Sequence, residues 1–516
     1  MKSPDPEERL SPQQWGQVIT IAGIGTVLEW FDFYTYTQLN ATLDRVFFPT
    51  DNEAIQALAF WGVYAAGFVV RPIGALIFGH IGDTAGRNRC LVVSILFMAF
   101  STVAIGVLPT YSTGVYRAGI AAPVLLALLR ILQGLALGGE HSSAMCYISE
   151  LADKGQRGRF TAVLQWCVNI GMIIATLMAM MLQNTLSEDA MLNWGWRVPF
   201  LCAAATALLG AALRRNMPEP HAFLEAARLQ KRLASGGGVA ADAAEDGAGG
   251  QRCGACQAPQ SCGACQVVRP PTAPDLLVQV AAGSEVQSDS LSDAPVEAVH
   301  GHAAARTPIV RLMRTNLAGV GLHICHMSWV SAAFYLTCSW LAKDLRTYGY
   351  PLKMTQGILI VSLIPNAVGL FLGGLALDRG LPALYSNMAL VTAATALAFP
   401  VFYGVGRSLA AAWCLVPLFQ LFVGAVQVHS LLPCTRIYEP LSRTTGFSFG
   451  YNCGYGIIGG LSPLLVAAIK TGLPGHVHPF APALWLLFLA GVSVLGDVGL
   501  RLYQPRLGKP FVGHIE

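Results

Sequence analysis

The chain alternates between short polar segments and long, almost uncharged apolar stretches. A helix needs about 20 mostly apolar residues to cross about 30 Å of hydrocarbon. Because unpaired backbone groups are costly in lipid and these stretches are too long for barrel strands, each predicts a transmembrane helix. Twelve stretches satisfy this requirement, with ends set to within about four residues. They are 17–40, 55–81, 90–109, 119–150, 161–184, 197–213, 318–342, 355–378, 385–406, 409–435, 444–470 and 480–502.

The composition agrees with a chain that lies mostly in a membrane. Of the 516 residues, 54% are hydrophobic and 12% are charged, whereas soluble proteins carry roughly 25% charged residues. This excludes a secreted domain, a cytosolic enzyme and a nucleic-acid-binding protein. We therefore predict an all-α, multi-pass membrane protein with the lipid bilayer as its surroundings.

The placement of positive charge predicts the orientation. An even number of spans puts both termini on one side, and that side carries about 23 of the 33 Lys and Arg residues, against about 8 on the other. Residues 1–16 and 503–516 are thus expected in the cytoplasm, and the plasma membrane is the membrane we expect the chain to span. Acidic residues in the first segment, Asp5, Glu7 and Glu8, argue against a cleaved signal or transit peptide.

The spans divide six and six, which predicts two bundles at 17–213 and 309–502. Between them, residues 214–308 are rich in Ala, Gly, Ser and Asp, and we expect a largely disordered cytoplasmic linker. Its two ends, 218–234 and 308–316, have the pattern of short amphipathic helices. A weak repeat relates 79–87 to 373–380, each with an acid and a base after a glycine-bearing helix end. Pseudo-symmetric halves of this kind hold a binding site between them.

Several ionisable residues fall inside the predicted spans, where a charge costs on the order of 3 kcal/mol. The first span holds Glu29 and Asp32, the second Arg71, and the fourth Arg130 and Glu140. On the fourth helix, Arg130, Gln133 and His141 share one stripe, and Glu140 lies beside it. We interpret Arg130 as an anion-binding group and Glu140 as a titrating group. The alternative is that these charges, Arg71 included, pair internally and only tie helices together.

Other polar residues carry weaker signals. His323 and His326, three residues apart, could share a proton or a metal, but two histidines lack a third ligand, and with His429 they are more typical of hydrogen-bonded groups in a bundle. Two CxxC pairs at 253–256 and 262–265 are too closely spaced for a usual zinc site, so no metal is predicted. The ridge of Gly446, Gly450 and Gly454 favours close helix packing.

Taken together, several motifs resemble the major facilitator superfamily, and within it the metabolite:proton symporters that include proline/betaine, 2-oxoglutarate, citrate and shikimate permeases. The segment 79–91, GHIGDTAGRNRCL, resembles the superfamily's loop signature. Further matching segments lie at 25–34, 71–74, 130–150, 157–158, 195–200, 446–452 and 459–463. The resemblance covers the chain outside the linker and is strongest in the first half. Thr84, where the family usually has Arg, and His141, beside Glu140, depart from its pattern.

This resemblance implies twelve helices in two pseudo-symmetric six-helix bundles and alternating access. It also implies uptake of a small organic acid or zwitterion together with a proton. The proton gradient is then the driving force, and no cofactor is expected. On this reading, the proton-coupling residues are Asp32, Glu140 and Glu29. The substrate-binding residues are Arg130, Arg71, Gln133, His141 and Tyr34. The residues of the cytoplasmic gate are Asp83, Arg87, Glu150 and Arg157.

Three alternatives stay open at this stage: an uncoupled facilitator of the same fold, an exporter, and a non-transporting nutrient sensor that signals through 214–308. The fifth span lacks the glycine–proline pattern of many antiporters, which favours import. An enzyme is not expected, because no nucleophile–base pair or metal cluster lies in the spans. The sequence names no particular substrate and predicts no oligomeric state.

Overall fold

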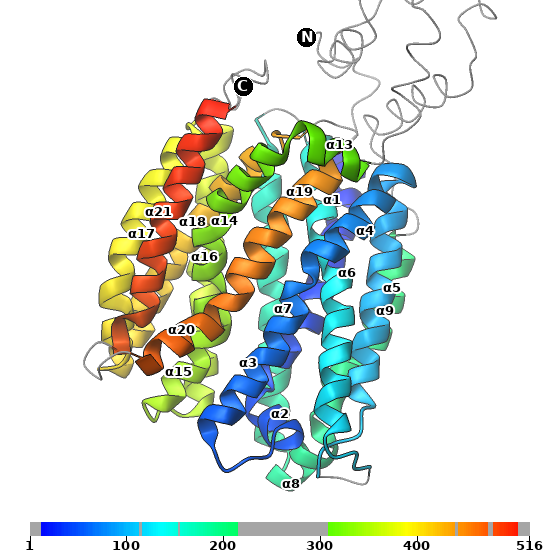
Figure 1. Cartoon of the computed structure of the whole chain (residues 1–516), viewed down its shortest axis with the longest axis vertical. Helices are drawn as coiled ribbons and strands as arrows, with labels where there is room; N and C mark the ends of the chain where they lie inside the picture. The colour runs from blue at the N-terminus through cyan, green and yellow to red at the C-terminus, as the bar shows by residue number, and fades with distance from the viewer. Residues whose placement is uncertain are drawn as a thin grey trace, which may run out of the picture.

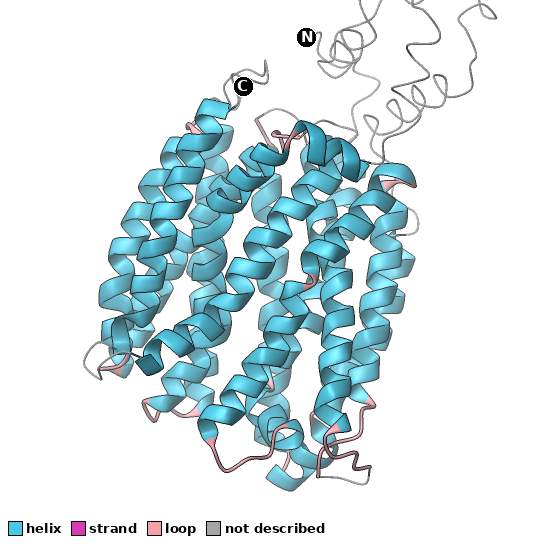
Figure 2. Ribbon diagram, viewed as in Figure 1, coloured by secondary structure: helices cyan, strands magenta, loops and turns pink. Residues whose placement is uncertain are grey.

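The computed structural model describes residues 12–112, 116–152, 155–214, 308–438, 442–472 and 478–503. Every regular element among them is helical (Figure 2). Most of the expected linker, including 218–234 and both CxxC pairs, lies outside the described residues, as do nearly all of the two terminal segments.

The first half consists of helices that follow the predicted spans closely. They are α1 (Pro12–Gln38), α2 (Asn40–Phe47), α3 (Glu53–Val69), α4 (Arg71–Thr84), α5 (Arg87–Gly106), α6 (Ala121–Leu151), α7 (Arg157–Thr185), α8 (Glu188–Ala190), the π-helical η2 (Met191–Gly195) and α9 (Arg197–Arg214). The expected second span is broken at Val70, because Pro72 lacks the N–H that a continuous helix requires.

The second half repeats this pattern. Its elements are α13 (Pro308–Thr315), α14 (Leu317–Tyr335), η4 (Leu336–Trp340), α15 (Leu341–Thr347), α16 (Leu352–Asp378), α17 (Ala383–Val405), α18 (Leu409–Cys434), α19 (Arg443–Tyr451), η6 (Asn452–Gly459), α20 (Gly460–Gly472), η7 (His478–Phe480) and α21 (Ala481–Tyr503). The segments η4 and η6 are π-helical, so the expected seventh and eleventh spans are interrupted. Such wide turns are frequent at functional sites.

Within the described residues, ten helical spans are long and apolar enough to cross a membrane. α1 and α9 occupy the positions of the first and sixth predicted spans but are not among those ten. Large apolar side chains cover the outer surface, for example Phe100, Leu208 and Leu495, which are 66%, 70% and 71% exposed. An apolar exterior of this kind belongs in lipid, and it supports the predicted multi-pass membrane protein.

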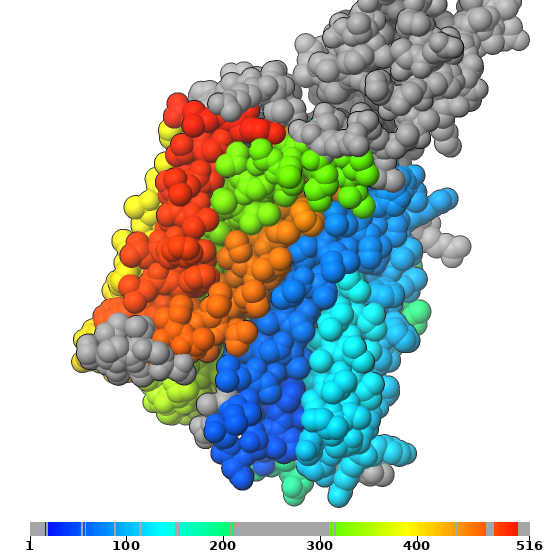
Figure 3. Space-filling view, in the orientation of Figure 1, coloured from blue at the N-terminus to red at the C-terminus, as the bar shows by residue number. Residues whose placement is uncertain are grey.

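The two halves lie side by side, one coloured blue to cyan and the other green to red (Figure 1). The end of α9, the helix α13 and the end of α21 gather at one end of the molecule, which we call the α13 end. The opposite end carries α2 and α8, and we call it the α2 end. Between the halves, α19 packs on α4 and α20 packs on α3 (Figure 3).

Glycines set the closest helix crossings. A Cβ on Gly134 would clash with the backbone of Gly67, and one on Gly138 would clash with the backbone of Arg71. The backbones of α6, α3 and α4 therefore approach each other closely at these glycines. The ridge on α19 and η6 also packs as predicted, with Gly450 against His323 and Gly454 against Met327.

Candidate functional site

The candidate site is built around two buried guanidinium groups in the first half. Arg71 begins α4 and Arg130 lies in α6, and these residues are 3% and 0% exposed. Both Cζ atoms lie 4.7 Å from the centroid of the Phe33 ring. Arg71 also lies 4.0 Å from the Phe68 ring, and Arg130 lies 4.3 Å from the Tyr36 ring. Cation–π contacts of this kind offset part of the cost of burying the charges.

Gln133 positions Arg130. The Arg130 Nη1 donates to Gln133 Oε1 at 2.8 Å, and Gln133 Nε2 donates to Thr102 Oγ1 on α5 at 2.6 Å. The amide oxygen of Gln133 therefore faces the guanidinium, and its amide nitrogen faces away. The sequence predicted Gln133 as a substrate contact, whereas in this structure its side chain holds Arg130.

Arg71 reaches the other half of the protein. Its Nη1 donates to the hydroxyl of Tyr335 on α14 at 3.3 Å. Tyr335 also packs edge-on against Phe68, with centroids 5.0 Å apart. The sequence analysis did not select Tyr335, because a tyrosine in an apolar span gives no signal of its own partner.

The three acids predicted for proton coupling are all buried in the same half. Glu29 and Asp32 on α1 are 2% and 5% exposed, and Glu140 on α6 is 0% exposed. Thr206 on α9 donates to Asp32 Oδ1 at 3.4 Å. Asp32 and Glu140 lie within electrostatic reach of each other, so their charges repel when both are ionised. Asp32 and Glu140, two of the three acids that the sequence predicted for proton coupling, thus lie close enough to interact.

Aromatic and polar side chains line the junction between the halves. The His141 ring lies 6.0 Å from Trp30 and 5.5 Å from Tyr451 on α19. Tyr34 donates its hydroxyl to the backbone oxygen of Cys338 in η4, and Tyr64 donates to Ser339 Oγ in the same segment at 3.1 Å. Of the predicted substrate contacts, Tyr34 and His141 therefore both face the second half.

Two of the predicted gate residues, Asp83 and Arg157, have described contacts, each with a different partner. Asp83 accepts hydrogen bonds from the Thr445 backbone N–H and hydroxyl at 3.0 and 2.6 Å. Arg157 begins α7, and its Nε donates to the backbone oxygen of Ala152 at 3.1 Å. The side chains of Arg87, the first residue of α5, and Glu150, in α6, lie outside the described part of the structure.

Contacts between the halves occur at both ends of the molecule. At the α2 end, Lys343 Nζ pairs with Asp44 Oδ2 at 3.0 Å. Near the middle, Asn169 Nδ2 on α7 donates to Asn366 Oδ1 on α16 at 2.7 Å. At the α13 end, Asp378 on α16 accepts from the backbone N–H of Gly158 at 2.7 Å. The two halves therefore touch at both ends of the molecule and near its middle.

The histidines of the second half have separate partners. His323 Nδ1 contacts the Tyr438 hydroxyl at 2.9 Å, while the His326 ring contacts Asp497 and the Ser430 backbone. They do not share a ligand, and among the described residues no three His, Cys, Asp or Glu side chains gather as a metal site would require. Asp497 was not among the predicted site residues, although an acid within the last apolar span is the signal that would have found it.

Two solved structures share this fold over most of their length. Over 98% of this chain and 99% of the other, it matches the structure of a proton:xylose symporter of the major facilitator superfamily, with a TM-score of 0.67 and 14% identity. It also matches the human organic anion transporter structure, with a TM-score of 0.56 and 15% identity. At these identities the likeness concerns the fold alone.

Sequence comparisons confirm the predicted resemblance. Residues 18–236 match the family model described as sugar (and other) transporter. The chain is 41% identical over 199 residues to the alpha-ketoglutarate permease of Escherichia coli strain K12, a stretch that covers 38% of this chain and 45% of that protein. It is 34% identical over 207 residues to the proline/betaine transporter of Salmonella typhimurium, covering 40% and 41%. The matched stretch thus spans less than half the length of these two relatives.

Proposed function

We propose that this protein is a proton-coupled symporter that takes up a small organic acid or zwitterion by alternating access. In this proposal twelve transmembrane helices form two six-helix bundles, 17–213 and 309–502, with 214–308 and both termini in the cytoplasm and the plasma membrane as the site of action. The bundles rock about the buried charges, which face one side of the membrane and then the other.

The observation that carries the proposal is the pair of guanidiniums stacked on Phe33. Arg130 and Arg71 are buried and point toward the same ring, and Arg71 already contacts Tyr335 of the second half. A carboxylate between the halves would be bound by guanidinium donors in geometry that an ammonium cannot supply. The names of the two matched relatives, which concern a keto acid and a zwitterion, support a carboxylate-bearing substrate.

Proton coupling rests on the neighbouring carboxyl groups. Asp32 and Glu140 lie in the half that carries both arginines. Arrival of an anionic substrate adds negative charge near these groups, so protonation of one of them lowers the repulsion. Substrate and proton therefore favour each other's binding, which is the condition for symport.

The test is the pH change outside de-energised cells that express the full chain, after addition of single carboxylates and zwitterions. We expect alkalinisation with one class of compound, and loss of this signal in Glu140→Gln. The matched control is Glu188→Gln, since Glu188 is a solvent-exposed acid paired with Arg45 at the α2 end. Labelled uptake of the same compound without any pH change would instead show an uncoupled facilitator and would overturn the proposal.

A further inference from the structure

A second buried ionisable pair lies in the other half of the protein, away from the arginine site. His326 on α14 contacts Asp497 on α21, and both residues are 0% exposed. Asn387 on α17 donates its amide to the two Asp497 oxygens at 3.3 and 3.0 Å. Ser430 on α18 donates its hydroxyl to Asn387 Oδ1 at 3.0 Å. One side chain from each of four helices thus joins a single hydrogen-bonded cluster.

The contacts determine where protons lie in this cluster. His326 Nε2 faces the backbone oxygen of Ser430 at 3.0 Å, and a carbonyl only accepts, so Nε2 carries a hydrogen. His326 Nδ1 faces Asp497 Oδ1, and this contact is a hydrogen bond only if one further proton lies between the two atoms. Nδ1 and Oδ1 therefore share one proton. The pair is neutral overall, either as imidazolium and carboxylate or as imidazole and carboxylic acid.

Asn387 and Ser430 orient the Asp497 carboxyl toward His326. Because Ser430 donates to the amide oxygen of Asn387, the amide nitrogen must face Asp497. Asp497 Oδ2 is thereby satisfied by an N–H, and Oδ1 is left facing the histidine. If only helix packing were required, apolar side chains of similar volume would serve as well or better than a buried ion pair.

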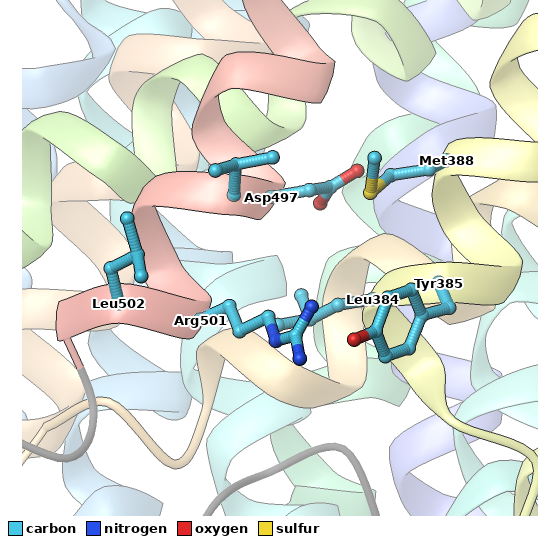
Figure 4. A pocket seen from close by; sticks show the side chains of 7 residues that line it. Leu384, Tyr385, Met388, Asp497, Arg501 and Leu502 are labelled. Atoms are coloured by element: carbon cyan, nitrogen blue, oxygen red, sulfur yellow. The ribbon is translucent and has the colours of Figure 1, made fainter.

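A pocket leads to the cluster from the α13 end. Its volume is about 470 Å³, and it lies between α17 and α21 (Figure 4). Asp497 forms one wall together with Met388, while Arg501 and Tyr385 lie on the opposite side. The Arg501 guanidinium sits 4.7 Å from the Tyr385 ring, and both side chains are exposed. The pocket thus extends from an exposed charged group to a carboxyl that has no exposed surface itself.

Other titratable groups face the pair from the helices around it. Cys434 on α18 is within hydrogen-bond reach of His326, and His429 on the same helix and His323 on α14 lie within electrostatic reach. Arg501 faces it across the pocket from α21 and Tyr385 from α17. Among these surrounding groups, Arg501, at the exposed side of the pocket, is the one that stays positively charged at physiological pH.

We propose that His326 and Asp497 form a proton-binding site, distinct from Asp32 and Glu140, that exchanges its proton with the α13 side of the membrane through the pocket between α17 and α21. This site does not depend on the substrate proposed above. The ligand of this site is the proton. Gain or loss of this proton changes the charge at the contact between α14 and α21.

Infrared difference spectroscopy on the full chain in liposomes tests the site without transport. Between about pH 5 and about pH 9 we expect a carboxyl or imidazole band that titrates. The same band should disappear in Asp497→Asn and in His326→Gln, because both groups share one proton. A band that survives in either variant, or no titrating band in the unmodified protein, would overturn the proposal.

A second pair of variants tests the route and leaves the hydrogen-bonded cluster intact. These variants remain informative if the first ones fail to fold. Met388→Trp fills the pocket, and Ala389→Trp places the same side chain on the exposed neighbouring position of α17. After a rapid pH jump, the band should respond about tenfold or more slowly in Met388→Trp and at the unmodified rate in Ala389→Trp. Equal rates in the two variants would refute the route.

Discussion

The carboxylate of Asp83, near the end of α4, accepts two hydrogen bonds from Thr445, in the first turn of α19. The pseudo-symmetric acid Asp378, at the end of α16, accepts from the backbone N–H groups of Gly158 and Arg159 in the first turn of α7. N–H groups in a first turn lack helical partners and attract anions. Each half thus holds the start of a helix from the other half, and both contacts lie at the α13 end.

Neutralising either acid should loosen the start of the helix that it contacts in the other half. Hydrogen bonds to charged groups contribute about 1.5–3 kcal/mol, so Asp83→Asn should speed amide hydrogen exchange in the first turn of α19 by about tenfold or more. Asp378→Asn is the matched control and should act on the first turn of α7 instead. Mass spectrometry of the two peptides measures both effects. Equal changes in both helices in either variant would contradict this assignment.

Replacing Arg130 by Lys should weaken substrate binding although the charge is kept. The ammonium loses the planar stacking on Phe33 and Tyr36 and the bond to Gln133. We expect an affinity loss of about 1.5–3 kcal/mol, roughly tenfold to 150-fold, measured by binding of the labelled compound found in the pH assay. Gln133→Leu should cause a smaller loss, because it removes only the group that orients Arg130. An Arg130→Lys protein with unchanged affinity would exclude Arg130 from the substrate site.

Gly134→Ala should destabilise the crossing of α6 and α3. Its Cβ would clash with the backbone oxygen of Gly67, and overpacking of this kind costs about 1–3 kcal/mol. Gly62→Ala on α3 is the control, because nothing lies within 4 Å of its Cβ, and it should be neutral or stabilising by up to about 1 kcal/mol. Thermal unfolding in detergent would show a lower midpoint for the first variant alone. Similar midpoints for both would mean that the crossing relaxes freely.

Asp44 should make closure of the α2 end depend on pH. It lies outside the spans and is 8% exposed, and burial raises the pKa of its carboxyl although the Lys343 ion pair counteracts part of this effect. When the halves separate there, hydration returns the pKa toward its usual value. The closed form therefore binds the proton more tightly, so acid favours closure, and closure weakens as pH rises through the raised pKa.

The measurement is hydrogen exchange of α2, expressed as a ratio to the Asp44→Asn variant at each pH so that the intrinsic chemical dependence cancels. The ratio should rise as the pH rises through the raised pKa and level off above it. A flat ratio would mean that Asp44 keeps the same hydration in both forms. Lys343 remains in both proteins, so its own charge does not enter the comparison.

Predictions of helix ends were accurate where the ends are determined by residues nearby in the chain. The ends of α16, α17, α18 and α21 lie within about three residues of the predicted spans, because hydropathy along a helix records its own surroundings. Prolines and π turns changed the interior of the spans at 53–84, 317–347 and 443–472. Pro72 is visible in the sequence, whereas the π turns depend on which neighbour packs beside the helix. The hydropathy of the chain is the same with or without any of these breaks.

From the residues alone it follows that the chain is helical, that it has two halves with an apolar surface, and that Arg71, Arg130, Asp32 and Glu140 lie in spans where their burial calls for a function. Their partners depend on how the helices pack. Tyr335 lies 264 positions from Arg71, and Asp497 lies 171 positions from His326. Burial follows from the residue types nearby in the chain, whereas a hydrogen bond between distant helices follows from how the helices pack in space.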